Sequence, residues 1–142
     1  MRTPRRPWRI ALSLLYAAAL LCVSLTPASA PTGSPTGLLL RRWLLNLLHV
    51  PAYAGLTLLF TWAIADPRRR TWIPLLPACV LAVAVGVTTE LLQKYVEGRC
   101  PTLLDALLNV LGCALAVWLV THTRLFGRLT DRSESLAEET TG

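Results

Sequence analysis

Seven polar side chains with the chemistry of proton transfer or ligand binding interrupt or flank three long apolar stretches. Carboxylates and a histidine can exchange protons, an arginine can hold an anion, and amide or phenol groups can fix a ligand by hydrogen bonds. These side chains are His49, Tyr53, Glu90, Gln93, Arg99, Asp105 and Asn109. Of these, Glu90, Asp105 and His49 are the candidates for acid–base catalysis, and all seven are candidates for binding.

No nucleophile stands out beside these residues. Thr102, Tyr53 and Cys100 are candidates by location only. One histidine with two carboxylates falls short of a recognisable metal set, and the cysteine spacings match no zinc pattern. The sequence therefore predicts no metal site and no cofactor.

The composition indicates what surrounds these side chains. Of 142 residues, 54% are hydrophobic and only 15% are charged. A soluble domain of this size needs more polar surface, so the apolar excess indicates lipid as a second solvent. The net charge of +6 comes from arginines clustered between apolar runs. Such clusters are typical of membrane-surface anchors, so we expect the lipid bilayer as partner and no nucleic acid.

Four apolar stretches predict four transmembrane helices, at about residues 9–26, 44–65, 72–92 and 103–122. Crossing the hydrocarbon of a bilayer takes about 20 helical residues. We predict an all-α membrane protein, a four-transmembrane-helix bundle. It has a basic N-terminus at 1–8, a membrane domain at 9–124 and a polar tail at 125–142 whose composition is typical of disorder.

The first stretch has a second interpretation, as a cleaved signal peptide. Basic residues precede the apolar run at 10–25, and Ala28-Ser29-Ala30 follows it as a cleavage signal. Pro31 would then be the first mature residue, a position where proline obstructs cleavage. We favour a retained helix, and cleavage after Ala30 stays the alternative.

Helix alternation brings the polar residues together. The N-terminal segment, the turn at 66–71 and the C-terminal flank carry ten of the fourteen basic residues. The positive-inside rule then places both termini in the cytoplasm and the polar ends of three helices on the outer side. Charged side chains at membrane depth usually face the bundle interior and pair with other polar groups there. We expect Glu90 and Asp105 to converge there on Arg99, His49 and Tyr53.

Each of these residues also has a structural interpretation. Thr102 and Asp105 have the spacing of a capping box, so Asp105 would only cap the fourth helix. Asn109 would join two helices by a hydrogen bond, and Glu90 with Arg99 would form an interfacial ion pair. His49 would be a satisfied interior histidine.

The same residues carry a family resemblance. His49-x-x-x-Tyr53-x-x-Leu56, Glu90-x-x-Gln93 and Gly98-Arg99-x-x-Thr102-x-x-Asp105-x-x-x-Asn109-x-x-Gly112 resemble the signature of VanZ-like membrane proteins. The similarity covers roughly residues 44–118. Leu45 and Asn46 stand where many members carry Asp and Lys.

The resemblance implies a multi-pass protein of the bacterial plasma membrane. It links the chain to the cell envelope and to resistance against glycopeptide antibiotics, mainly teicoplanin. It does not imply a specific biochemical activity. One hypothesis is a protein that binds a lipid headgroup, an envelope precursor or a partner protein at its outer polar face. A second is an intramembrane enzyme that acts on a lipid-linked or envelope substrate by carboxylate and histidine acid–base chemistry. A third is a small transporter subunit.

Reporter fusions test the predicted topology. A fusion after Gly142 should be active as a cytoplasmic reporter, and a fusion at Gly98 as an extracytoplasmic one, because the basic residues are retained inside. The same fusions in a known four-span protein serve as the control. Reversed activities at the two sites would contradict an outer polar face.

Overall fold

The computed structural model describes residues 7–27, 35–65, 74–97 and 102–123, and this part of the chain is helical apart from short turns. The predicted tail at 125–142, the candidate cleavage site at 28–31 and residues 1–6 lie outside it. The helices are α1 (Pro7–Ser24), α2 (Pro35–Leu47), α3 (His49–Ile64), α4 (Leu75–Gln93) and α5 (Leu103–His122).

Four segments of the described chain are long and apolar enough to cross a membrane. They are Pro7–Ser24, Trp43–Ile64, Leu75–Gln93 and Leu103–His122. Large apolar side chains cover their outer surfaces: Leu15, Leu76 and Leu107 are 67%, 73% and 57% exposed. Such a surface is unfavourable in water and favourable in lipid. The prediction of an all-helical protein with four apolar spans is confirmed.

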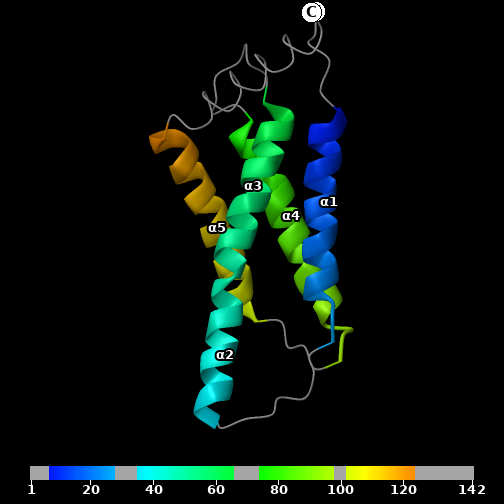
Figure 1. The fold of residues 1–142 in the computed structure, drawn as a ribbon, viewed down its shortest axis with the longest axis vertical. Helices are drawn as coiled ribbons and strands as arrows, with labels where there is room; N and C mark the ends of the chain where they lie inside the picture. The colour runs from blue at the N-terminus through cyan, green and yellow to red at the C-terminus, as the bar shows by residue number, and fades with distance from the viewer. Residues whose placement is uncertain (1–6, 28–34, 66–73, 98–101, 124–142) are drawn as a thin grey trace, which may run out of the picture.

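α2 continues the line of α3, and the two are separated by a break at Leu48 (Figure 1). The sequence predicted a helix from about residue 44, whereas α2 already begins at Pro35, where proline's fixed φ suits the first helical position. Pro51 cannot donate to the carbonyl of Leu47, and its ring crowds that carbonyl. This explains why α2 ends at Leu47 and a second helix starts at His49.

The starts of α4 and α5 follow local signals in the sequence. Pro74 occupies the N-cap position of α4 without a side-chain capping bond, and Pro77 lies in the first turn, where a missing amide N–H does least harm. The predicted start at residue 72 falls in the segment 66–73, outside the described residues. α5 begins with a capping box formed by Thr102 and Asp105.

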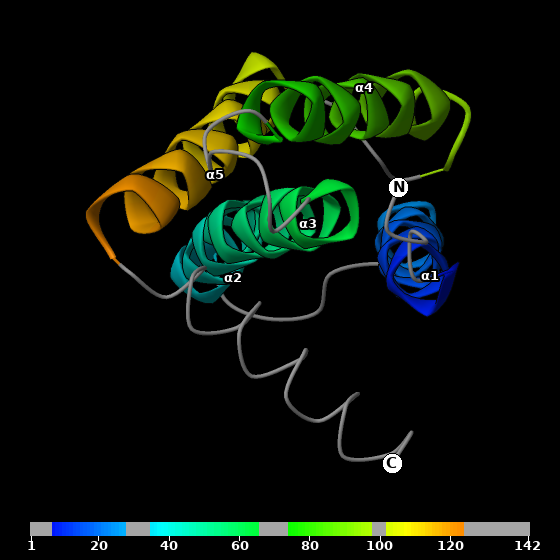
Figure 2. The same ribbon diagram turned by 90° about the horizontal axis from the view of Figure 1, so that it is seen from above.

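α3 is the central helix and contacts α1, α4 and α5 (Figures 1 and 2). It runs parallel to α5 and antiparallel to α1 and α4 (Figure 1). Leu56 of α3 is fully buried, as are Ala78, Ala82 and Ala116 on its neighbours. Small residues at such contacts let helices approach closely in lipid. We call the end at which α3 and α5 begin and α4 ends the polar end.

Two glycines in the middle turns of α5 and α4 permit this close approach. A Cβ atom on Gly112 of α5 would lie 2.6 Å from the carbonyl oxygen of Val50 and 3.0 Å from the amide nitrogen of Ala54, both on α3. A Cβ atom on Gly86 of α4 would lie 3.2 Å from a ring carbon of Tyr53. Backbone atoms cannot move aside as a flexible side chain can, so the α3–α5 contact requires glycine at 112.

α1 is joined to α3 by side-chain hydrogen bonds. The Ser13 hydroxyl lies 3.1 Å from the carbonyl oxygen of Leu59, and the Tyr16 hydroxyl donates to the carbonyl of Ala52 at 3.3 Å. Ser13 is 1% exposed, so the first of these bonds is shielded from solvent. Polar contacts of this kind help helices associate in lipid.

Further contacts hold both ends of α1 in place. The guanidinium carbon of Arg9 lies 4.8 Å from the centre of the Trp62 ring of α3, within the range of a cation–π interaction. Trp8 meets the same ring edge-on at 4.8 Å. At the other end, the Gln93 amide of α4 donates to the carbonyl of Ser24 at 3.1 Å. These contacts make α1 a part of the bundle.

We therefore expect α1 to remain in the mature protein. Removal of residues 1–30 would leave the Leu59 carbonyl, the Trp62 ring and the Gln93 amide without these partners. The intact mass of the purified protein should correspond to a chain that retains α1. A secreted protein with a known leader, expressed in the same cells, controls for signal-peptidase activity. A mature chain that begins at Pro31 would contradict the expectation.

Candidate functional site

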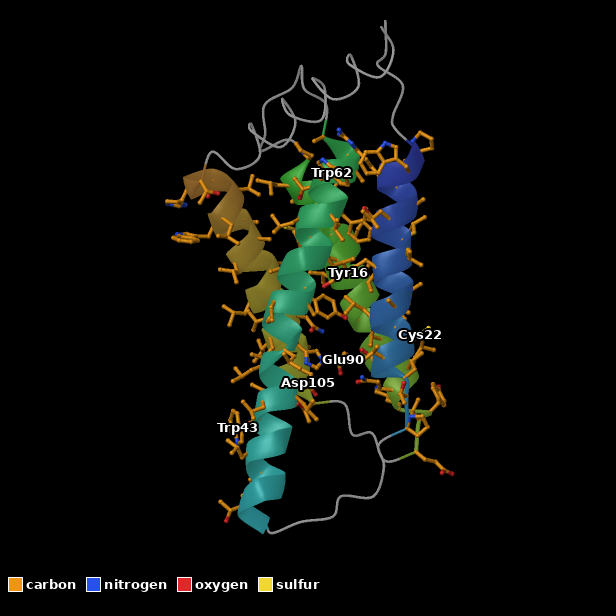
Figure 3. The ribbon with its side chains drawn as sticks, in the orientation of Figure 1. Tyr16, Cys22, Trp43, Trp62, Glu90 and Asp105 are labelled. Carbon is orange, nitrogen blue, oxygen red and sulfur yellow. The ribbon has the colours of Figure 1, made fainter. Side chains whose placement is uncertain are left out.

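The structure places six of the seven candidate side chains near the polar end. His49 and Tyr53 lie in the first turns of α3, Asp105 and Asn109 in those of α5, and Glu90 and Gln93 in the last turn of α4; Figure 3 shows Glu90 and Asp105 at nearly one level. The seventh candidate, Arg99, lies outside the described residues. The predicted convergence of both acids on Arg99 therefore stays a prediction.

Asp105 caps α5 with one of its two carboxylate oxygens. Oδ2 accepts hydrogen bonds from the Thr102 amide at 3.1 Å and from the Thr102 hydroxyl at 2.8 Å. The Asp105 amide donates back to the hydroxyl at 3.4 Å, which completes the box. The other oxygen, Oδ1, is buried and has no hydrogen-bond partner within the described residues. Capping thus occupies half of this carboxylate.

Asn109 lies one turn further along α5 and is 4% exposed. Its amide nitrogen lies 3.1 Å from the place of a Cβ atom on Gly86, so α4 packs directly against it. Its amide oxygen is buried and unpaired among the described residues. The structure therefore shows helix packing at Asn109 and no hydrogen bond of its side chain to a neighbouring described helix.

His49 is oriented by a backbone contact. Its Nδ1 lies 3.0 Å from the carbonyl oxygen of Asn46, and a carbonyl only accepts, so Nδ1 carries the hydrogen. In the neutral ring, Nε2 then has a free lone pair. The ring stacks on Tyr53, with centroids 6.4 Å apart and planes 5° apart. His49 therefore presents an acceptor at the polar end.

Glu90 is half-buried and makes no hydrogen bond or ion pair to another described residue. It lies close enough to Asp105 and His49 for their charges to interact. Figure 3 shows the two labelled carboxylates at nearly one level, between the lower parts of α4 and α5. A carboxylate from α4 and another from α5 thus lie within electrostatic range of a histidine from α3.

Two neighbouring residues have contacts that the sequence did not indicate. Gln93 was predicted to line the site, and the structure shows its amide nitrogen bound to the Ser24 carbonyl of α1. Thr89, which was not singled out, is 3% exposed, donates to the Val85 carbonyl at 2.8 Å and lies beside the Tyr53 side chain. Its place one turn before Gln93 on the same face of α4 is the signal that identifies it.

The described part of the site is rich in acceptors. Asp105 Oδ1, Asn109 Oδ1, His49 Nε2 and the Glu90 carboxylate all offer lone pairs, and they come from three helices. The described residues contain no group of three or more His, Cys, Asp or Glu side chains placed to share a metal ion. The arrangement suits an organic ligand that donates hydrogen bonds.

Comparison of the chain with models of protein families, with curated proteins and with solved structures finds no match. The similarity to VanZ-like proteins therefore rests on the sequence motifs alone.

Substitution of Asp105 separates its capping role from its charge. Asp105→Ala should lower the free energy of unfolding by about 1 kcal/mol, because the Thr102 amide and hydroxyl lose their acceptor. Asp105→Asn should lower it much less, since an amide oxygen can replace Oδ2. Unfolding of the purified protein in mixed detergent micelles measures both. Glu97→Ala, at an exposed carboxylate just after α4, is the control. Equal losses for both Asp105 variants would show that charge, not capping, stabilises this end.

Proposed function

We propose that the chain is a VanZ-like membrane protein of the bacterial cell envelope whose polar end faces outward and binds the headgroup of a lipid or lipid-linked envelope precursor. The positions of the motif residues support this. His49 and Tyr53 stack, Thr102 and Asp105 form the cap, and Gly112 sets the α3–α5 contact. These residues build one end of the bundle, and the positive-inside rule assigns that end to the outer side.

The observation that carries the proposal is the pair of unpartnered oxygens, Asp105 Oδ1 and Asn109 Oδ1. A buried acceptor without a donor is destabilising by about 1–3 kcal/mol. Buried hydroxyls elsewhere in the bundle avoid this loss. Those of Thr57, Thr61 and Thr89 donate to the carbonyl four residues earlier, at 2.8, 2.7 and 2.8 Å. Within the described residues, buried side-chain acceptors without a partner occur only in Asp105 and Asn109, which favours a ligand site over a purely structural cluster.

One observation favours the enzyme as a second candidate. The Nδ1 contact with Asn46 leaves His49 Nε2 free to take a proton, and Glu90 lies within electrostatic range. A histidine oriented in this way is a plausible general base in geometry. Binding remains the favoured proposal. A nucleophile would be hydrogen-bonded to the His49 ring, and no hydroxyl or thiol of the described residues makes such a bond.

Lipids that co-purify with the protein test binding against catalysis. Protein isolated in nanodiscs from its host should be enriched in one headgroup class by mass spectrometry. Protein with the paired changes Asp105→Ala and Asn109→Leu should lose this enrichment, because both unpartnered acceptors are gone. A bound lipid that is chemically unchanged after incubation supports binding. A new lipid product would favour the enzyme, and equal lipid content in both proteins would contradict a headgroup site.

The envelope role has its own readout in cells. Overexpression in a susceptible bacterium should modestly raise the inhibitory concentration of teicoplanin, and the paired variant should not. Immunoblots of the membrane fraction confirm equal amounts of both proteins. An unchanged inhibitory concentration with wild-type protein would contradict the envelope role and leave the fold unaffected.

A further inference from the structure

The charges at the polar end narrow the choice of ligand. Glu90 and Asp105 are two carboxylates within electrostatic range, and within the described part of the chain neither has an ion-pair partner. Partly buried carboxylates are stable only with a compensating charge or a bound proton. Arg99 was predicted to offset these acids and lies outside the described residues. Among the described residues, the basic group within electrostatic range of Glu90 is His49, whose neutral ring carries no charge, so the ligand is left to balance negative charge.

The hydrogen-bonding groups point the same way. Asp105 Oδ1 and Asn109 Oδ1 are buried acceptors one turn apart on α5, in residues 92% and 96% buried, and Asn109 packs against Gly86 of α4. Glu90 and His49 Nε2 add acceptors from α4 and α3. The ligand group must therefore donate several hydrogen bonds from a small volume. A primary ammonium has three donors and one positive charge, which suits this set.

Other ligand groups fit less well. A phosphate or carboxylate would place negative charge beside Glu90 and Asp105. A metal ion lacks a group of three coordinating side chains among the described residues. A sugar or glycerol could donate to the acceptors but would leave the excess negative charge unbalanced.

We infer that the polar end recognises a primary ammonium group, carried by an amine-containing lipid headgroup or by a soluble amine. The inference rests on the proposed function and specifies its ligand. Asp105 Oδ1 and the Glu90 carboxylate hold the positive charge, and Asn109 Oδ1 accepts another of its hydrogens. The stacked rings of His49 and Tyr53 form the aromatic side of the site, where a cation is favoured.

Binding of matched headgroups to the full chain in detergent micelles tests the inference. The probes are short-chain phosphatidylethanolamine, its N-acetylated form, phosphatidylglycerol with the same acyl chains, and free ethanolamine. We expect phosphatidylethanolamine to bind at least about tenfold more tightly than the N-acetylated form, the difference typical of losing a charge-assisted hydrogen bond. Calorimetry or native mass spectrometry gives the dissociation constants. Comparable affinity of free ethanolamine would identify a soluble amine as the source, whereas binding of the lipid alone would identify a headgroup.

Variants test whether the preference for the amine-containing lipid arises at this site. Glu90→Gln and Asp105→Asn keep the side-chain shape and remove one charge each, and each should reduce the preference for the amine by about tenfold. Glu97→Gln removes an exposed carboxylate just beyond α4 and should leave the preference unchanged. Circular dichroism verifies that each variant is folded.

The outcomes separate this inference from the proposed function. Equal affinity for phosphatidylethanolamine and its N-acetylated form, or tighter binding of phosphatidylglycerol, would overturn ammonium recognition while headgroup binding stands. A preference that survives both charge-removing variants would place the amine elsewhere and also overturn it. Absence of binding by every probe would overturn ammonium recognition, while enrichment of an amine-free lipid in the co-purification would show that headgroup binding stands.

Discussion

The contact between α3 and α5 at Gly112 determines the geometry of the polar end. A Cβ atom on Gly112 would lie 2.6 Å from the Val50 carbonyl oxygen, so the two backbones are in direct contact. This contact sets the middle of α5 against the first turns of α3, so Asn109 and Asp105 follow about one and two turns nearer the start of α5. Gly86 then allows α4 to close against the same point. The close approach of the α3, α4 and α5 backbones is what brings polar side chains from three helices to one end of the bundle.

Lipid offers no hydrophobic force to hold helices together, so packing and polar contacts must do so. In this bundle the apolar side chains are largely outside, and hydroxyl groups lie inside. Ser13, Thr57 and Thr61 are each at most 1% exposed, and each has a hydrogen bond to a backbone carbonyl. These interior hydroxyls are thus satisfied, which sets apart the oxygens of Asp105 and Asn109 that have no hydrogen-bond partner among the described residues.

The sequence predicted the four spans because their length and apolar composition reflect the thickness of the bilayer. It also predicted that residues from three helices share one end, because successive spans alternate in direction. It did not predict the break at Leu48, because the helix was expected to begin only at about residue 44, which leaves out most of α2. The contacts of Gln93 with Ser24 and of Tyr53 with Thr89 depend on the rotation of each helix about its axis, which weakly amphipathic apolar segments leave undefined.

α2 extends past the ends of its neighbours (Figure 1), and its exposed side chains include Leu39, Leu40 and Trp43. Together α2 and α3 run from Pro35 to Ile64, roughly 45 Å of helix at 1.5 Å per residue, against about 30 Å of hydrocarbon. The apolar span within it, Trp43–Ile64, is only about 33 Å long, so the first turns of α2 rise past the hydrocarbon into the headgroup layer. A lipid headgroup bound at the polar end would therefore lie in the same layer as the start of α2.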